Sequence, residues 1–242
     1  MELAVAFLPA LANDWEDRIC IVIDVIAASS SIVTILENGA AAVYPVHAVD
    51  RARRFAAEHG FLLCGEREGL PLPGFDCGNS VAEFIDMDFS GKGVVLTTSN
   101  GTIALEQVAR AKGVLVGCAR NRTACAEIAL NIAVRKDANL GIVCAGYKHD
   151  FALDDAVCAG LLVDTMAYMA GGQLELSDSA LAAQTLYQGS RDLIREFERS
   201  ASGRRLKEIG RASDLPLCAS IDASKTVPQM TCGENLVIRP FA

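Results

Sequence analysis

The 242-residue sequence contains no long hydrophobic run, although hydrophobic residues make up 51% of it. Its apolar stretches are short and interrupted by charges, whereas a bilayer-spanning helix needs about 20 consecutive apolar residues. Basic residues are also scarce: 22 Lys and Arg accompany 30 Asp and Glu, and the densest basic groups are Arg51-Arg53-Arg54 and Arg204-Arg205. The net charge of −8 therefore argues against nucleic acid or a membrane as a partner, and we expect a soluble protein.

Zinc-binding patterns are absent as well. The sequence has three scattered histidines and no CxxC pair, which disfavours a structural zinc site. Its nine cysteines lie mostly within apolar runs, as expected of buried thiols in a reducing cytoplasm. Thiol chemistry at Cys64, Cys77 or Cys158 is disfavoured, because a reactive cysteine needs nearby positive charge or a helix N-terminus.

The first residues lack the features of a secretory signal, although the ALA at residues 10–12 is similar to a cleavage site. The segment has no basic start, carries Glu2 and is interrupted by Pro9. We therefore expect residues 3–8 to form an edge strand instead.

Short apolar runs alternate with longer helical patterns up to about residue 170. This alternation predicts βαβ units and a three-layer α/β/α fold with a largely parallel or mixed sheet. Runs such as ICIVIDV and GVVLTT are apolar throughout, as expected for strands buried on both faces. The expected strands are 3–8, 19–26, 41–46, 61–65, 93–98, 113–117 and 140–145, and the expected helices are 29–38, 49–59, 80–86, 101–111, 121–136 and 152–170.

The sequence pattern changes after Gly171-Gly172. A long amphipathic run, from Ser177 to about Ser200, precedes the basic segment GRRLKEIG, and a hairpin or edge strand is expected around Leu236–Arg239. No Pro/Ser-rich linker separates this region from the rest. We therefore expect a single domain over residues 1–242, in which residues 1–170 form the sheet core and residues 171–242 form a helical appendage and closing strand.

Polar side chains follow several of the expected strands, at the sheet edge where open α/β folds bind ligands. Asp24 ends an apolar run, and a buried carboxylate is costly there unless it meets a cation. Ser29 and Ser30 open the next expected helix, where they either cap free amides or help to hold an anion.

The turn after the fifth expected strand reads TTSNGT. Its glycine permits a tight turn in which amides and hydroxyls converge on one point, which is phosphate-binding chemistry without a P-loop lysine. The absence of GxxxxGK[ST] and GxGxxG motifs disfavours the common nucleotide-binding folds. The candidate phosphate-binding residues of this turn are Thr98, Asn100, Gly101 and Thr102.

Two further segments carry candidate residues. The loop over residues 64–84 holds Glu66, Arg67, Asp76 and Asn79 among four glycines and two prolines, and so many fixed turns and polar groups favour a functional loop.

After the seventh expected strand, Lys148 precedes the pair Asp154-Asp155. These acidic residues either complement a helix dipole or contribute to a metal site.

Together these motifs resemble the 2-phosphosulfolactate phosphatase family over nearly the whole chain. IVIDVIAASSSIVT is similar to the family strand ending in D-V-L-R-A-[ST]-[ST], GEREGLPLPGFDCGNS to its G-E-R-x-G loop, and VVLTTSNGT to its T-T-x-N-G-T-R turn. CAGYKHDFALDDAVCAG and SGRRLKEIGRASDLPLCASID also fit. The resemblance implies a cytoplasmic, Mg²⁺-dependent phosphatase that acts on a small sulfonated phosphoester in coenzyme M biosynthesis.

The sequence departs from this family pattern at three positions. Ala27 and Ile103 stand where the resemblance implies arginines, and Lys148 replaces a carboxylate. Arginine holds anions through two parallel hydrogen bonds, which alanine and isoleucine cannot form. We therefore expect an altered substrate, smaller or less charged than the family's.

The resemblance and the motifs lead to a phosphoric monoester hydrolase of the 2-phosphosulfolactate phosphatase type. Its expected catalytic residues are Asp24, Glu66 and Arg67, with Asp24 either the nucleophile or a metal ligand. The expected Mg²⁺ ligands are Asp24, Glu66, Asp76 and Asp154. The residues expected to bind the substrate and its phosphate are Ser29, Ser30, Asn79, Thr98, Asn100, Gly101, Thr102 and Lys148.

A second hypothesis follows from the same departures. The chain would then be a catalytically weak, phosphatase-like protein that binds a phosphorylated or carboxylated metabolite. The expected partner in both cases is a small anionic molecule, and a homo-oligomer is compatible with the sequence.

Overall fold

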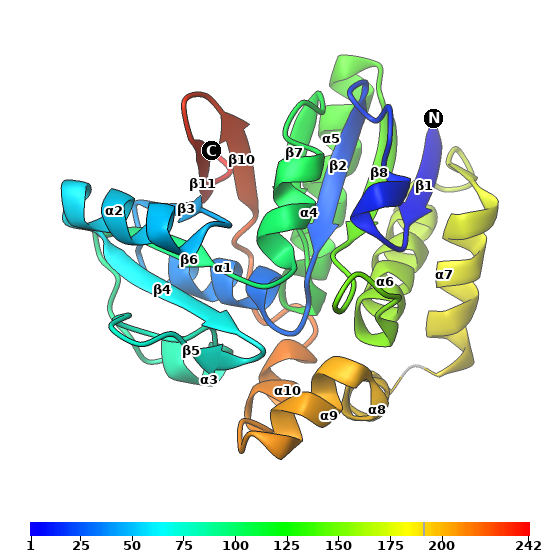
Figure 1. Cartoon of the computed structure of the whole chain (residues 1–242). Helices are drawn as coiled ribbons and strands as arrows, with labels where there is room; N and C mark the ends of the chain where they lie inside the picture. Colours follow the sequence, from blue (N-terminus) through cyan, green and yellow to red (C-terminus); the bar gives the residue numbers. More distant parts are fainter. Residues whose placement is uncertain (191) are drawn as a thin grey trace.

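A computed structural model describes residues 1–190 and 192–242. Within these ranges one mixed sheet of 11 strands runs through the molecule in the order β5-β4-β6-β3-β11-β10-β7-β2-β8-β1-β9 (Figure 1). The strands are β1 (Glu2–Ala6), β2 (Arg18–Ile23), β3 (Ala42–Pro45), β4 (Leu62–Arg67), β5 (Leu70–Pro71), β6 (Gly93–Thr97), β7 (Gly113–Val116), β8 (Asn139–Cys144), β9 (Glu175–Leu176), β10 (Pro228–Cys232) and β11 (Leu236–Pro240).

The sheet consists of two parallel groups joined by an antiparallel hairpin. One group contains β4, β6 and β3, and the other contains β7, β2, β8, β1 and β9. The hairpin of β10 and β11 lies between them and pairs with β7 on one side and β3 on the other. The predicted hairpin is therefore present, but it lies in the middle of the sheet and is not an edge strand. The expectation of an edge strand over residues 3–8 was wrong, because β9 lies outside β1.

Strand β2 shows why these residues form a buried sheet. Ile21 pairs with Leu115 of β7 and Ile142 of β8, so β2 has a neighbour on both sides. Its β-branched residues suit the pleated backbone, and successive side chains point to opposite faces. Ile21 belongs to the core shared with α5, α6 and α7, whereas Val22 belongs to the core shared with α1 and α4. The three-layer arrangement predicted from the continuous apolar runs is confirmed.

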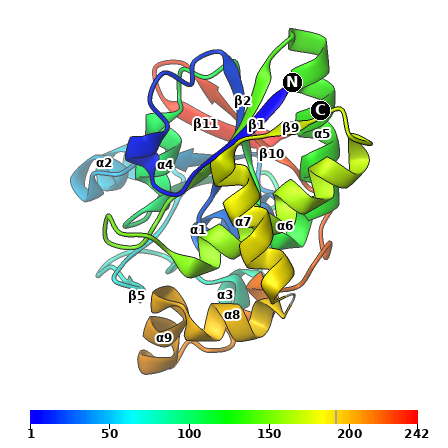
Figure 2. The ribbon, with the colours of Figure 1, turned by 90° about the vertical axis from the view of Figure 1, so that its right-hand side faces the viewer.

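Helices cover both faces of the sheet (Figures 1 and 2). None of those in the described ranges combines the length and apolar character needed to cross a membrane. The helices are α1 (Ala28–Glu37), α2 (Val49–His59), α3 (Val81–Phe84), α4 (Gly101–Gln107), α5 (Arg122–Lys136), α6 (Leu153–Met169), α7 (Asp178–Gly189), α8 (Leu193–Arg199), α9 (Ala201–Glu208) and α10 (Asp214–Cys218), with short 3₁₀ turns η1 (Pro9–Leu11) and η2 (Ala119–Asn121).

The predicted amphipathic run from Ser177 to about Ser200 forms two helices, α7 and α8; Arg191, within that run, lies outside the described residues. The Ser177 hydroxyl caps α7 by accepting a hydrogen bond from the amide of Ala180 at 3.2 Å. Helices α8, α9 and α10 lie below the sheet in Figure 1, at the end where β2 finishes. The carboxyl ends of the parallel strands therefore face this group of helices.

The nine cysteines are free thiols, and eight of them are buried, with only Cys232 exposed. Burial raises the pKa of Cys20 to about 12 and raises the pKa of Cys144 and Cys158 well above the ordinary value. The prediction of buried thiols is therefore confirmed for eight of the nine.

Gly160 allows α6 and α7 to pack closely side by side (Figure 2). A Cβ atom on Gly160 would lie 2.0 Å from the carbonyl oxygen of Ala183 and 2.8 Å from Cβ of Tyr187. Both atoms belong to α7, so a larger residue must push the two helices apart.

We therefore expect Gly160→Ala to lower the free energy of unfolding by about 3 kcal/mol, as overpacking of a close contact does. Urea denaturation followed by circular dichroism measures the change. Gly189→Ala is the matched control, because nothing lies within 4 Å of a Cβ at this last residue of α7; we expect it to gain about 0.5 kcal/mol. Equal stabilities of the Gly160→Ala variant and the wild type would contradict the close packing.

Candidate functional site

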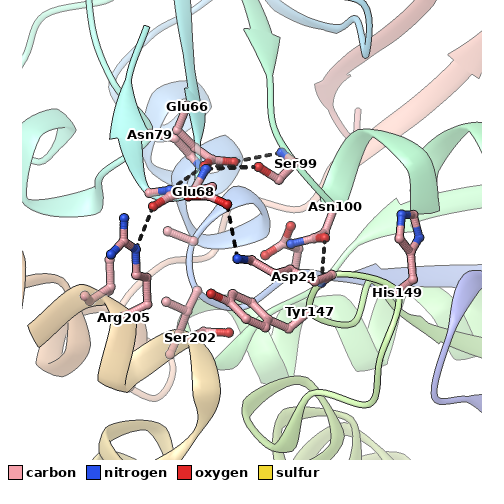
Figure 3. A pocket seen from close by; sticks show the side chains of 15 residues that line it. Asp24, Glu66, Glu68, Asn79, Ser99, Asn100, Tyr147, His149, Ser202 and Arg205 are labelled. Atoms are coloured by element: carbon pink, nitrogen blue, oxygen red, sulfur yellow. Dashed lines mark hydrogen bonds and ion pairs between the residues drawn. The ribbon is translucent and has the colours of Figure 1, made fainter. Parts of the chain in front are cut away.

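A pocket of about 360 Å³ lies at the carboxyl ends of β2, β4, β6 and β8 (Figure 3). The loops that follow these strands form most of its wall, as expected for an open α/β sheet. Helix α9 closes the opposite side. The lining residues are Asp24, Ile26, Ala27, Glu66, Glu68, Gly69, Asn79, Ser99, Asn100, Tyr147, Lys148, His149, Ser202, Arg205 and Leu206.

Asp24 follows β2 directly and is 8% exposed. A Cβ atom on Gly101 would lie 2.7 Å from Oδ2 of Asp24, so only glycine allows α4 to begin against this carboxylate. Burial and the charges of Glu66 and Asp154 raise the pKa of Asp24 well above its ordinary value, although amide hydrogen bonds from Ala28 and Gly101 partly oppose the rise. Asp24 is thus a carboxyl group held in an environment that favours a proton or a cation beside it.

Glu66 is fixed by main-chain amides of two loops. Its Oε1 accepts a hydrogen bond from the Ser99 amide at 2.7 Å, and its Oε2 accepts one from the Gly69 amide at 2.6 Å. The Ser99 hydroxyl lies 3.3 Å from Oε2. Glu66 therefore connects the β4–β5 turn to the loop before α4 and keeps a fixed orientation in the pocket.

The two acidic residues that open α6 have different surroundings. Asp155 Oδ1 accepts a hydrogen bond from the Val25 amide at 2.9 Å, and its Oδ2 accepts one from the Gly146 amide at 3.0 Å. Asp155 thus joins the loop after β2 to the loop after β8. Asp154 is 1% exposed, and its Oδ1 has no hydrogen-bond partner. Burial raises the pKa of Asp154 to about 6, against the effect of hydrogen bonds from Ser202 and Ser200.

Three further lining residues, Asn79, Asn100 and Lys148, carry polar groups suited to an anion or a cation. The Oδ1 atom of Asn79 is buried and has no hydrogen-bond partner. Asn100 accepts a hydrogen bond from the Lys148 amide at 3.3 Å. Together with Asp24 and Glu66, these are the sequence-predicted residues that line the pocket. Gly101 and Asp154 are outside the lining but affect Asp24: Gly101 packs against its carboxylate, and the charge of Asp154 raises its pKa.

Four of the predicted hydroxyl residues shape the loops and do not line the pocket. The Ser29 hydroxyl donates to the carbonyl oxygen of Asp24 at 2.8 Å, and the Ser30 hydroxyl donates to that of Val25 at 2.8 Å. Thr98 and Thr102 bond to each other: the Thr102 amide donates to Thr98 Oγ1 at 3.2 Å, and the Thr102 hydroxyl donates to the Thr98 carbonyl at 3.0 Å. Short polar side chains reach the nearby backbone readily, so these hydroxyls form hydrogen bonds with the backbone of their own loops and do not point into the pocket.

Arg67 and Asp76 lie outside the pocket lining. Arg67 follows Glu66 on β4, and its guanidinium donates to the His47 carbonyl at 2.7 Å and to Thr97 Oγ1 at 3.0 Å. Asp76 Oδ2 accepts a hydrogen bond from the Leu63 amide at 2.8 Å. Both side chains hold β4 to its surroundings.

Helix α9 contributes residues that the sequence did not identify as part of the site. Ser202, Arg205 and Leu206 line the pocket, and Ser202 and Ser200 lower the pKa of Asp154 against the effect of its burial. The basic segment GRRLKEIG was the available signal, but its contacts with the loop after β4 span 137 residues of sequence. Contacts at that separation leave no local pattern.

The oxygen donors in this region fit Mg²⁺ chemically. Asp154 and Asn79 each present a buried oxygen without a hydrogen-bond partner, and the charge of Asp154 acts on Asp24. In the part of the chain that the structure describes, no three His, Cys, Asp or Glu side chains form a complete metal-binding cluster. Mg²⁺ needs only one or two carboxylates, because it usually keeps several waters and binds substrate phosphates.

Comparison with known proteins gives a consistent result. A family model described as 2-phosphosulpholactate phosphatase matches residues 7–233 of the chain. A protein of Thermus thermophilus named "Probable 2-phosphosulfolactate phosphatase" is 34% identical over 242 residues, which cover 99% of each chain. Proteins of the same name from Clostridium acetobutylicum and Pseudothermotoga lettingae are 34% and 35% identical, over 91% and 93% of this chain and 93% of each relative. The matched range includes every residue that lines the pocket.

The raised pKa of Asp154 predicts how stability depends on pH. Because its folded pKa of about 6 exceeds the usual value of 3.8, the folded protein binds this proton more tightly than the unfolded chain. The stabilisation that this bound proton gives the folded protein is complete below about pH 4 and is lost as the pH rises through 6.

We therefore compare the change that Asp154→Asn makes to the free energy of unfolding of the metal-free protein at pH 8 and at pH 4. We expect the change to be more stabilising at pH 8, by on the order of 2 kcal/mol, because asparagine has no charge to bury. Thermal unfolding in a chelating buffer at the two pH values measures the difference. Asp17→Asn, a change at an exposed position, should leave the pH profile unchanged. A parallel shift of the Asp154→Asn curve at both pH values would contradict the prediction.

Proposed function

The chain belongs to the 2-phosphosulfolactate phosphatase family, and we propose that it is a Mg²⁺-dependent phosphatase that hydrolyses a small phosphoester of the 2-phosphosulfolactate type. The observation that carries this proposal is the position of Asp24. It lies at the end of β2 against the first residue of α4, in a pocket with Glu66 and close to Asp154. A phosphoryl group and a cation both fit the chemistry of this position.

The chain's own residues account for binding and orientation. Asp24 would hold the metal together with Asp154 and Asn79, or attack the phosphorus as a nucleophile, and both roles remain within the proposal. The amides of Ala28 and Gly101, at the starts of α1 and α4, donate hydrogen bonds to Asp24 and favour its ionised form, the form that either role requires. Bound Mg²⁺ would offset charge on the phosphoryl oxygens and polarise the P–O bond.

The remaining residues fix the pocket around the substrate. Glu66 and Asp155 hold the loops after β2, β4, β6 and β8 through main-chain amides. Fixed loops keep the reacting groups oriented, which contributes strongly to catalysis. Action in the cytoplasm within coenzyme M biosynthesis belongs to the same proposal and rests on the motif resemblance.

Asp24→Asn tests the proposal directly. We expect hydrolysis of 4-nitrophenyl phosphate by the wild type to need Mg²⁺, and we expect the substitution to lower kcat by about a thousandfold, because asparagine cannot attack phosphorus and lacks the negative charge that a carboxylate offers a divalent cation. The measurement is the rate with added Mg²⁺ and with a chelator. Robust turnover that is independent of metal and survives the substitution would overturn the assignment.

Asp76→Asn is the matched comparison for Asp24→Asn. Asparagine retains the oxygen that accepts the hydrogen bond from Leu63, and the residue lies outside the pocket. We expect a rate within about threefold of the wild type. A loss as large as that of Asp24→Asn would return Asp76 to the metal ligands.

A weak, phosphatase-like binding protein is the second candidate function, and the lining of the pocket favours it at two positions. Ala27 is 6% exposed and offers the pocket only a methyl group. Ile103 lines an adjoining cavity of about 180 Å³ that shares Asn100 and His149 with the main pocket. Neither residue can bind the anionic groups of 2-phosphosulfolactate.

The double variant Ala27→Arg, Ile103→Arg separates the two functions. For an active enzyme with altered specificity, we expect kcat/KM for 2-phosphosulfolactate to rise about tenfold or more, because a charge-assisted hydrogen bond contributes about 1.5–3 kcal/mol. Steady-state kinetics on folded protein, checked by thermal unfolding, measure this change. No activity in either the variant or the wild type, together with tight binding of the phosphoester, would favour the binding protein.

A further inference from the structure

The pocket contains two permanent positive charges among its described lining residues. Lys148 belongs to the loop between β8 and α6, and Arg205 belongs to α9. The Lys148 side chain is 57% exposed and the Arg205 side chain is 28% exposed, so both lie at the mouth of the pocket. The buried acidic residues Asp24 and Asp154 lie deeper.

Glu68 contacts both of these cations, Lys148 through its side chain and Arg205 through its main chain. Its Oε1 lies 3.1 Å from Nζ of Lys148, and its main-chain carbonyl oxygen accepts a hydrogen bond from Nε of Arg205 at 3.0 Å (Figure 3). Arg205 also has Nη1 3.5 Å from Oε2 of Glu208, a residue outside the pocket lining. A single residue of the β4–β5 turn thus contacts the two other segments that form the mouth.

The charge and the exposure of the Glu68–Lys148 ion pair allow another anion to replace the Glu68 carboxylate. The hydrogen bond and charge of Lys148 lower the pKa of Glu68, and Glu68 raises the pKa of Lys148, so both groups are ionised at neutral pH. Their side chains are 63% and 57% exposed, and an ion pair this exposed contributes little to stability. A carboxylate or sulfonate of a ligand can therefore replace the Glu68 carboxylate at small energetic cost.

We propose that Lys148, next to Arg205, forms a second anion subsite, in which the Glu68 carboxylate pairs with Lys148 until the acid group of a substrate displaces it. The inference rests on the proposed function and assigns residues to it: Lys148 would receive the carboxylate or sulfonate of the substrate, and Glu68 would compete with that group. The acid group of such a substrate forms an ion pair with Lys148, which replaces the ion pair between Lys148 and Glu68. A phosphoester without a second acid group leaves Glu68 in place and gains nothing from the two cations.

Isothermal titration with two non-hydrolysable ligands tests the subsite without turnover. Phosphonoacetate and methylphosphonate share a phosphonate and differ by one carboxylate. Both are titrated, in the presence of Mg²⁺, into the wild type, Glu68→Gln, Lys148→Met and the double variant. All three variants change exposed side chains, and thermal unfolding checks that they fold.

Glu68→Gln should tighten binding of phosphonoacetate about two- to fivefold, the range that follows from releasing an exposed ion-pair partner. Methylphosphonate should change by less than twofold. Lys148→Met should weaken phosphonoacetate binding, and the gain from Glu68→Gln should vanish in the Lys148→Met background, because Lys148 is the cation that the Glu68 carboxylate pairs with.

Glu198→Gln is the matched control. Glu198 pairs with Lys207 at the same 3.1 Å separation, is similarly exposed, and lies outside the pocket lining. Its removal should change neither affinity.

Several outcomes would overturn the proposal. These are equal tightening of both ligands, a gain that persists without Lys148, and a wild type that does not prefer phosphonoacetate. The phosphatase assignment is judged separately, by Mg²⁺-dependent hydrolysis of 4-nitrophenyl phosphate. The predicted affinity pattern without turnover would support the subsite in a binding protein, whereas turnover without that pattern would leave the phosphatase and remove the subsite.

Discussion

The arrangement of this molecule depends on the cost of placing three carboxyl groups, Asp24, Asp154 and Asp155, at one buried end of a parallel sheet. Each is at most 8% exposed, and burial raises the pKa of all three. Neighbouring acidic groups repel one another most strongly where water is excluded. Main-chain amides donate hydrogen bonds to Asp24 and Asp155, whereas one oxygen of Asp154 has no partner, and a divalent cation would offset the remaining charge.

The donors come from the loops and are therefore part of the fold. Asp155 accepts main-chain hydrogen bonds from Val25 and Gly146, which fixes the loops after β2 and β8 relative to each other. Gly101 brings the start of α4 against Asp24, a contact that any Cβ atom would prevent. The same contacts that satisfy the acidic groups thus determine the shape of the pocket. Because burying these groups lowers the stability of the folded protein, stability and function are expected to oppose each other at this site.

The sequence predicted what local pattern controls. The seven strands from β-branched runs, the helices between them and the polar residues at the strand ends follow from side-chain periodicity, and Asp24, Glu66, Asn79, Asn100 and Lys148 do line one pocket. Ser29 and Ser30 lie outside the pocket lining, and their hydroxyls bond to the backbone of a tight loop, a role that suits the same residue type equally well. A hydroxyl cluster after a strand is therefore weak evidence for an anion site.

Long-range contacts account for what the sequence did not reveal. The hairpin of β10 and β11 enters the middle of the sheet through few registered pairs, one of them Ile238 with Val43, nearly 200 residues apart in the chain. Arg205 reaches the pocket in the same way, through a contact with Glu68 across 137 residues. In both cases the partner, and not the local sequence, determines the position. Arg205 of α9 thus joins Lys148 at the mouth of a pocket whose interior contains Asp24 and Glu66, so that the basic residues lie at the mouth and the buried acidic residues lie inside.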